Sequence, residues 1–376
     1  MANGQPWFSV DRLRAFWQRT SEGLNAQQLW SQLRRETRTS LDLYSAETGR
    51  NLREEWSARK RRRVISAVAG AMYKRLTPVR RLLFIVAVVM LLFPSFQNVH
   101  GYGERVIFNS TVSALILLAL LVFELADRVG LKRDLEIAKD IQRMLLPEKP
   151  PALLGLDIAF GTKAANTVAG DYYDVFPRPG KTPDQNRVVL AVADVAGKSI
   201  PAAILMATFQ ASLKTLSTAQ VALPELVANM NRYACSNSQG GLRFTTAFLA
   251  EYDPVRRTLD YVNAGHNQPI LRRSNGSIER LDVGGLPLGI QPEAKYASAS
   301  VTLAPSDWLL IFTDGLVEAE NAPQEEYGES RVLSTIAASA TLTPSEMLKR
   351  LMTELDLFVG QTPQHDDVTL MLLKAE

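Results

Sequence analysis

The sequence predicts an α+β fold in which helices cover stacked β-sheets, and three observations support this fold class. Short β-rich runs fill the C-terminal half, as in 187–194 and 308–314. The run 245–265 resembles two strands joined by a turn, which favours antiparallel pairing. Helical segments separate the strand groups without alternating strictly with them, near 200–217, 223–236, 330–339 and 344–359. Such an arrangement is typical of a layered α+β domain.

Residues 1–78 predict a helical, basic, cytoplasmic region. Apolar side chains between Leu13 and Leu33 recur at roughly helical spacing. The favoured interpretation is a small helical region with a solvated basic face. The alternative is a helix on a membrane surface, with the basic run 59–63 against anionic lipid headgroups.

Residues 79–126 contain two apolar stretches, 82–96 and 106–126, which predict a hairpin of two transmembrane spans. A spanning helix needs about 20 mostly apolar residues and at least about 17. The second stretch is long enough and the first is short, and the alternative is a pair of buried core helices. Basic residues flank the pair, whereas the connecting loop carries only Arg105. Both termini are therefore expected on the cytoplasmic side of the inner (plasma) membrane, with lipid contacts along the spans.

Residues 127–148 predict a linker helix that ends before Pro147. Its apolar residues lie near one stripe, formed by Leu131, Leu135, Ala138, Ile141 and Leu145. Two interpretations have equal weight. The helix packs on its own domain, or it forms a short parallel coiled coil that makes a homodimer and transmits signals.

Residues 149–376 carry the candidate chemistry, because three aspartates lie at the ends of strand-like runs. Asp194 and Asp314 each close such a run, and Asp366 precedes the last one. Carboxylates are the ligands that Mg²⁺ and Mn²⁺ favour, and a metal-held water is a nucleophile at neutral pH. A single cysteine and three histidines argue against a zinc site. The pattern therefore predicts a metal-dependent hydrolase.

Further acids lie near these runs. Asp171 follows Gly170, a residue that lets the backbone approach a ligand closely, and Asp174 is three positions on. Asp366 and Asp367 are adjacent and must point to opposite sides of an extended segment, so only one is expected to bind metal. The other is expected to accept a hydrogen bond locally.

His266 has two interpretations. A neutral-range pKa would let it protonate a leaving alkoxide as a general acid. The favoured interpretation is a turn residue that hydrogen-bonds backbone groups and shapes the site.

The order of the motifs gives the most specific signal. The segments AGDYYD, ADVAGKSIPAA, TTAFLA, NAGHNQP, GLPLG, FTDGLVEA and HDDVTLMLL together resemble the PPM-type metal-dependent serine/threonine phosphatases. More narrowly, they resemble the bacterial branch of the stage II sporulation phosphatase and the sigma-factor stress regulators. The resemblance implies a β-sandwich flanked by helices, with two Mn²⁺ or Mg²⁺ ions between the sheets.

The resemblance also implies roles for individual residues. Asp194 matches the acid that bridges the two metals, and Val195 matches a position that gives its backbone carbonyl. Asp314 and Asp366 match the remaining metal-binding acids. Asp171 matches an acid that holds metal-bound water or an additional metal, and Asp174 carries lower weight in that role.

Some positions depart from the family pattern. Ala169 and Ser199 stand where the family usually has glycine, and neither change removes a ligand. The phosphate-binding arginine of the eukaryotic relatives has no clear match here. Lys163 is a low-weight candidate for that role.

The resulting functional expectation is a membrane-anchored protein serine/threonine phosphatase. By the resemblance, its partner is a phosphorylated protein, an anti-sigma-factor antagonist, and no nucleic-acid partner is expected. The alternative is a catalytically weak signalling scaffold that binds a phosphorylated partner. A nucleotide cyclase, suggested by AGDYYD alone, leaves Asp314 and Asp366 unexplained.

Overall fold

The computed structural model describes the second half of the chain almost completely and the first part in fragments. The described residues are 63–64, 66–67, 70, 73–74, 76–92, 102–180, 182, 186–197, 199–238, 241, 243–338 and 341–376, with the backbone alone for 102–108. The chain divides into two compact units, Met1–Arg128 and Val129–Glu376. Most of the predicted basic region 1–78, and the loop expected to connect two spans, lie outside the described residues.

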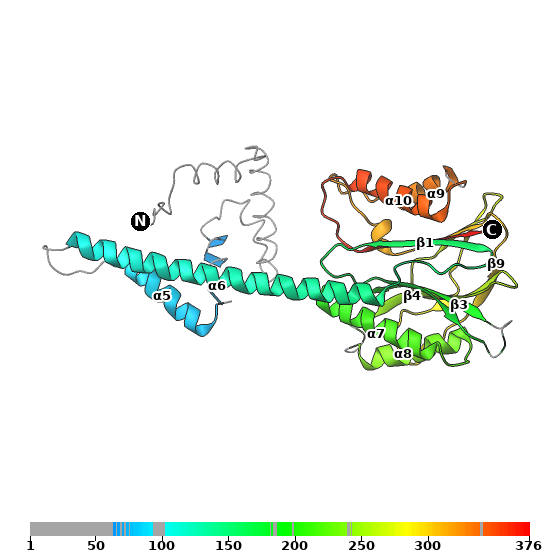
Figure 1. Cartoon of the computed structure of the whole chain (residues 1–376), viewed down its shortest axis with the longest axis horizontal. Helices are drawn as coiled ribbons and strands as arrows, with labels where there is room; N and C mark the ends of the chain where they lie inside the picture. Colours follow the sequence, from blue (N-terminus) through cyan, green and yellow to red (C-terminus); the bar gives the residue numbers. More distant parts are fainter. Residues whose placement is uncertain are drawn as a thin grey trace, which may run out of the picture. The chain divides into compact units, whose positions relative to one another are not determined.

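The first unit contains α5 (Pro78–Leu92) and the beginning of α6 (Tyr102–Leu145), which lie side by side (Figure 1). The Ser113 hydroxyl donates a hydrogen bond of 2.7 Å to the Ala87 carbonyl. Arg80 and Asp127 form an ion pair of 2.5 Å. Because the partners run in opposite directions along the two helices, α5 and α6 are antiparallel.

The prediction of two transmembrane spans is not supported. Nowhere in the described part of the chain is a helix both long and apolar enough to traverse a bilayer. Helix α5 has 15 residues, which is below the lower limit of about 17 for a span. In α6 the apolar run between Thr111 and Glu124 is also shorter than that limit. The predicted inner-membrane location and lipid contacts were inferred from these spans, so they are not supported either.

The second unit contains two β-sheets. The first sheet has the strand order β1-β11-β10-β6-β7, and the second has β2-β3-β4-β5-β8 with β9 paired to β5. The strands are β1 (Leu156–Lys163), β2 (Tyr172–Arg178), β3 (Arg187–Val195), β4 (Thr245–Asp253), β5 (Thr258–Ala264), β6 (Ile270–Arg272), β7 (Ile278–Arg280), β8 (Gly284–Gly285), β9 (Ala299–Thr302), β10 (Trp308–Phe312) and β11 (Val368–Ala375). Every described pairing is antiparallel except β5 with β8.

Helices cover the outer face of each sheet, so the unit has four layers (Figure 1). The second sheet packs on α7 (Ile200–Leu216) and α8 (Leu223–Ser236), and the first packs on α9 (Glu329–Ala338) and α10 (Pro344–Val359). A third core fills the space between the sheets. The predicted α+β fold of stacked sheets under helices is confirmed.

Side-chain alternation along β3 shows how the sequence specifies these layers. Leu190 and Val192 belong to the core between the sheets, whereas Ala191 and Ala193 belong to the core under α7 and α8. Successive residues of a strand point to opposite faces, and both faces are apolar here because both are covered. The next residue in the inward-facing series is Asp194.

Candidate metal centre

Asp194 is the second-last residue of β3 and faces the space between the two sheets. Its side chain points to the same face of β3 as those of Leu190 and Val192, which lie in the core between the sheets. Its partner across the ladder is Thr246 of β4. The β3 strand therefore presents a half-buried carboxylate at the rim of the inter-sheet core.

Asp314 and Asp366 come from the opposite sheet. Asp314 begins the short helix η2 (Asp314–Leu316) directly after β10, and Asp366 precedes β11. Because β10 and β11 are paired neighbours, the two acids leave the first sheet at the same edge. A Cβ atom on Gly315 would lie 2.1 Å from the Asp367 carbonyl oxygen, so only glycine allows η2 this close to the 366–367 segment.

The acids of the two sheets interact with one another. Burial raises the pKa of Asp194 to about 7, and the negative charges of Asp314 and Asp366 add to the rise. Like charges disfavour ionisation of a neighbouring carboxyl group, and this effect requires proximity. The three aspartates that the sequence singled out are therefore close enough for their charges to interact.

Asp171 is a fourth acid of this cluster and is 2% exposed. Burial holds its pKa well above the usual range, and the neighbouring charge of Asp194 raises it further. A hydrogen bond between the two carboxyl groups partly opposes the rise at Asp194. Thr313 also donates a hydrogen bond of 2.9 Å to the Asp171 carboxylate, which ties this acid to the end of β10.

Asp367 holds the loop that leads to Asp171, and its charge also acts on Asp171 and Asp194. Its carboxylate oxygens accept hydrogen bonds from the amides of Ala165 at 2.7 Å and Gly170 at 2.6 Å. A carboxylate engaged in this way is a loop anchor. Asp366 remains the candidate ligand of the adjacent pair.

Gly170 allows two backbone segments to meet at the site. A Cβ atom at this position would lie 3.1 Å from the Val195 carbonyl oxygen and 3.4 Å from the Ala202 Cβ. The sequence predicts that Gly170 lets the backbone approach a ligand, and the close approach seen here is instead to Val195, the residue whose carbonyl the family resemblance assigns to metal binding.

Gln142 of α6 fixes the residue before Gly170. Its side-chain amide donates a hydrogen bond of 2.6 Å to the Ala169 carbonyl and accepts one of 3.0 Å from the Ala169 amide. The Gln142 side chain is 7% exposed. The last turns of α6 therefore hold the segment that carries Asp171.

Two low-weight candidates lie elsewhere. Asp174 shares the alternation of Tyr172 and faces α7, where it accepts a hydrogen bond of 2.7 Å from the Tyr172 hydroxyl and pairs with Lys214 at 2.7 Å. The assignment of Asp174 to the metal site is wrong, because strand alternation turns it to the opposite face of the sheet. Lys163 forms an ion pair with Asp356 of α10, and nothing in its contacts supports phosphate binding.

His266 lies in the loop after β5 and is 5% exposed. Its Nδ1 atom is 3.0 Å from the Thr246 hydroxyl. Burial lowers the pKa of His266 to about 4, so the ring is neutral at pH 7. A neutral, enclosed ring is a poor general acid, and the contacts favour the structural interpretation of this residue.

The donor chemistry of the cluster suits a hard divalent cation. Four acids repel one another at the rim, and a cation would remove that repulsion. Within the described residues, no three histidine, cysteine or acidic side chains are already arranged closely enough to hold an ion. The acids are gathered, and metal binding would have to draw them closer.

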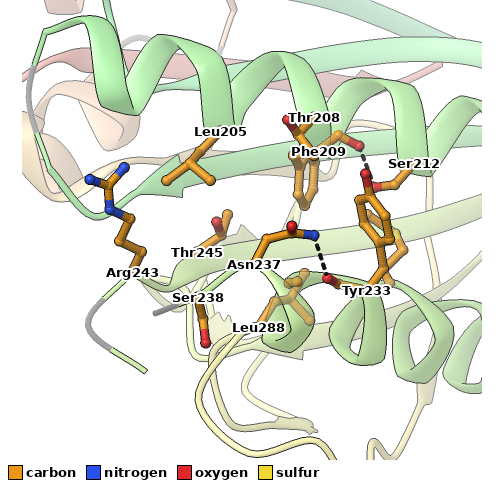
Figure 2. A pocket seen from close by; sticks show the side chains of 12 residues that line it. Leu205, Thr208, Phe209, Ser212, Tyr233, Asn237, Ser238, Arg243, Thr245 and Leu288 are labelled. Atoms are coloured by element: carbon orange, nitrogen blue, oxygen red, sulfur yellow. Dashed lines mark hydrogen bonds between the residues drawn. The ribbon is translucent and has the colours of Figure 1, made fainter. Parts of the chain in front are cut away.

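A small cavity of about 40 Å³ lies between α7, α8 and the start of β4 (Figure 2). Leu205, Phe209, Tyr233, Arg243 and Thr245 are among the residues that line it. The cavity is on the helix side of the second sheet, whereas Asp194 faces the other side. It is therefore separate from the acidic cluster.

Sequence reasoning missed several residues of this site. Gln142 sits among the apolar residues of its helix, seven positions after Leu135, and this is a signal for a buried polar contact. Thr313 directly precedes Asp314, but its contact with Asp171 spans 142 positions and leaves no local pattern. Glu318 is also close enough to interact with Asp314. Burial raises the pKa of Glu318, and the negative charge of Asp314 raises it further.

Comparison with known proteins gives the same picture. A family model described as Stage II sporulation protein E (SpoIIE) matches residues 184–376, just over half of the chain. Phosphoserine phosphatase RsbU of Bacillus subtilis (strain 168) is 29% identical over 247 residues, which are 65% of this chain and 70% of RsbU.

Two solved structures share the fold. The SiaA-PP2C domain of Pseudomonas aeruginosa matches with a TM-score of 0.57 and 22% identity, over 67% of this chain and 99% of that one. The RsbU and RsbW domains of Rv1364c from Mycobacterium tuberculosis match with a TM-score of 0.50 and 25% identity, over 62% of this chain and 63% of that one. The motifs, the sandwich and the matched residues agree: this chain belongs to the Stage II sporulation protein E family, and its second unit has the fold of the PP2C domain of SiaA.

Proposed function

We propose that this chain is a serine/threonine phosphatase that removes phosphate from a phosphorylated protein by a metal-activated water. The observation that carries the proposal is the interaction of Asp194 with Asp314 and Asp366, which come from opposite sheets and different parts of the sequence. The similarity to a phosphoserine phosphatase, RsbU, supports the choice of substrate. The chain covers about two thirds of RsbU and of the Rv1364c structure.

The residues of the site would divide the work. Asp194, Asp314, Asp366 and the Val195 carbonyl would hold two Mg²⁺ or Mn²⁺ ions, and Asp171 would orient bound water. The ions would supply charge stabilisation and a hydroxide at neutral pH. Asp367 and Gln142 hold the loop that carries Asp171, so their contribution is to position it.

The proposed partner is a phosphorylated antagonist of an anti-sigma factor, in a partner-switching pathway. The support is the similarity to the Rv1364c structure, whose described domains are RsbU and RsbW. No residue in the described part identifies this partner, so the proposal depends on the family.

The test measures phosphate release from a phosphoserine protein by the full chain. The wild type is assayed with Mn²⁺ and with EDTA, and the Asp194→Asn variant is assayed with Mn²⁺. The matched control is Asp260→Asn on β5, which replaces a half-buried aspartate paired with Ser300 away from the site. We expect EDTA and Asp194→Asn each to reduce kcat at least 100-fold, while Asp260→Asn stays within about twofold of wild type. Turnover that ignores both EDTA and Asp194→Asn contradicts the proposal.

A signalling scaffold remains the second candidate, because Ser199 has a backbone φ of 64° at the start of α7, where the family pattern usually has glycine. This scaffold would bind the phosphorylated partner tightly and release no phosphate. Measuring binding and turnover on the same phosphoprotein separates the two functions.

We also propose that α6 supports a homodimer. Within the second unit, one face of its last turns contacts the Ala169 segment through Gln142, while Ile137, Ile141 and Met144 are 49%, 55% and 82% exposed. These three residues have helical spacing and form an apolar stripe. Light scattering of Ile137→Glu/Ile141→Glu beside Arg143→Glu tests it: only the first variant should shift the mass toward a monomer.

A further inference from the structure

His266 occupies a fixed place at the end of the sandwich that carries the acids. It follows Gly265, whose φ of 67° and close contact with Pro287 produce a sharp turn after β5. A Cβ atom on Gly265 would lie 2.4 Å from the Pro287 ring, so this turn requires glycine. The His266 amide donates a hydrogen bond of 2.7 Å to the Asn263 side chain. The turn and this hydrogen bond fix the backbone from which the ring projects.

The ring contacts the second sheet beside Asp194. Its Nδ1 atom is 3.0 Å from the Thr246 hydroxyl, and Thr246 is the ladder partner of Asp194. Thr246 shares the alternation of Phe248, so both members of this pair face the first sheet. One hydrogen bond therefore connects the ring to the residue directly opposite Asp194.

The ring also contacts the first sheet. The Phe312 backbone is close enough to interact with the ring, and this interaction opposes part of the fall in the pKa of His266. Phe312 is the last residue of β10, two positions before Asp314. A single side chain thus touches the strand pair that carries Asp194 and the strand that leads to Asp314.

The chemistry of the ring matches a bridging role. The neutral imidazole has one nitrogen that donates and one that accepts. The Nε2 atom is enclosed and makes no hydrogen bond of normal geometry within the described residues. Enclosing a polar atom without a good hydrogen bond is unfavourable, and an apolar side chain would fill the same space without that cost. The ring therefore has one polar neighbour in a normal hydrogen bond, Thr246, and one in a looser contact, the Phe312 backbone.

We propose that His266 is a positioning residue that sets the distance between Asp194 and the Asp314–Asp366 edge, acting through Thr246 and the Phe312 backbone. This inference rests on the proposed metal site and goes beyond it, because it assigns the spacing of that site to a residue that binds neither metal nor substrate.

The experiment measures Mn²⁺ affinity by calorimetry on the full chain, together with kcat, KM and the pH profile of phosphate release. His266→Leu removes both polar contacts, and Thr246→Val removes the hydroxyl from the other side. The double variant completes a cycle. His266→Gln keeps one donor and one acceptor, and is the conservative rescue.

We expect His266→Leu and Thr246→Val each to weaken Mn²⁺ binding about tenfold, which corresponds to about 1.4 kcal/mol. The double variant should be no weaker than the weaker single variant, because both substitutions remove the same link. His266→Gln should bind Mn²⁺ within about threefold of wild type and keep the wild-type pH profile. In the single variants kcat should fall while KM changes little.

Several results would overturn the inference. Unchanged Mn²⁺ affinity in both single variants, additive losses in the double variant, or a wild type that binds no Mn²⁺ each contradict it. If His266→Gln retains Mn²⁺ affinity but loses the acidic or basic limb of the pH profile, His266 acts on protons and the inference also fails. A wild type that binds Mn²⁺ but releases no phosphate removes the proposed function alone, because the affinity cycle can still be measured.

Discussion

Gln142 and Ala169 exchange two hydrogen bonds, one in each direction, across 27 positions of sequence. A side-chain amide paired with a peptide group in this way satisfies a buried donor and a buried acceptor together. The paired peptide group lies two positions before Asp171. The conformation of an acid in the candidate site therefore depends on a residue of the linker helix.

Replacing Gln142 by Leu should destabilise the second unit and reduce catalysis. The Ala169 amide and carbonyl would be left buried without partners, at a cost of roughly 1–3 kcal/mol per group. Urea unfolding and phosphate release measure the two effects. Arg143→Gln, at an exposed position one residue on, is the control and should change neither by much. Full activity in Gln142→Leu would show that the Ala169 segment keeps its place without this contact.

Gly315→Ala should separate η2 from the 366–367 segment. The added methyl group would lie 2.1 Å from the Asp367 carbonyl oxygen, so one of the two segments must move. Overpacking of this kind typically costs about 1–3 kcal/mol, and we expect Mn²⁺ affinity to fall at least tenfold. Calorimetry with Mn²⁺ provides the measurement.

Gly130→Ala on α6 is the matched control for Gly315→Ala. Nothing lies within 4 Å of the position of its added Cβ. Alanine is favoured over glycine within a helix by up to about 1 kcal/mol, so this variant should be as stable as wild type or more so, with unchanged Mn²⁺ affinity. Equal effects of the two substitutions would contradict the close packing at η2.

Without metal, the second unit should lose stability as the pH rises. The folded pKa of Asp194 is about 7, above the ordinary value of 3.8 for an aspartate. Between these values the folded chain retains a proton that the unfolded chain releases, so the free energy of unfolding falls with rising pH. Each such group contributes at most about 1.4 kcal/mol per pH unit. Asp171, whose pKa is also raised, acts in the same direction as Asp194. His266 opposes the fall up to about pH 6.5, because burial lowers its folded pKa to about 4.

Unfolding of a fragment covering 129–376 with EDTA at pH 4.5 to 7.5 measures this slope. Trp308, the only tryptophan of that fragment and 1% exposed, reports on unfolding. Asp194→Asn removes one of the groups with a raised pKa and should shift the slope in the direction of greater stability at high pH, while Asp171 still contributes. A wild-type fragment that gains stability across the whole interval would be inconsistent with the raised pKa.

Ser199→Gly should stabilise the protein. Ser199 has φ of 64° and ψ of −146°, a region that L-residues rarely adopt, and its side chain makes no capping hydrogen bond. Glycine would relieve the strain of this conformation, which is roughly 1–3 kcal/mol. The greater freedom of glycine in the unfolded chain would offset about 0.5–1 kcal/mol of that gain. Ser212→Gly, within α7, should instead destabilise by about 1 kcal/mol. Thermal unfolding compares the two, and a lower midpoint for Ser199→Gly would contradict the strained conformation.

Local pattern predicted most of the fold. The helix segment 223–236 coincides with α8, and 344–359 coincides with α10, because an apolar stripe and a proline at the start are local signals. The hairpin at 245–265 is confirmed by the pairing of Asp253 with Thr258 between β4 and β5. These features depend on residues that are close in sequence.

The parts that failed depend on contacts between distant segments. Asp174 was grouped with Asp171 by proximity in sequence, but β2 is covered on both faces, so polarity could not reveal which face it takes. Asp367 and Thr313 gain their roles from partners 197 and 142 positions away. The apolar runs of α5 and α6 predicted membrane spans because the second run was counted across the polar cluster Asn109–Thr111 and the first was allowed to extend past Pro94, whereas α5 ends at Leu92 after 15 residues.

Asp366 is the candidate metal ligand and Asp367 holds the loop, so the register of the strand that follows them decides which carboxylate faces the site. β11 is paired along its whole length with β1, from Leu156 with Ala375 to Lys163 with Val368. A slip by one residue would reverse every side chain that follows the turn. An inserted residue between Asp367 and Val368 would therefore present the wrong carboxylate to the inter-sheet space, in a chain that still contains every acid of the site.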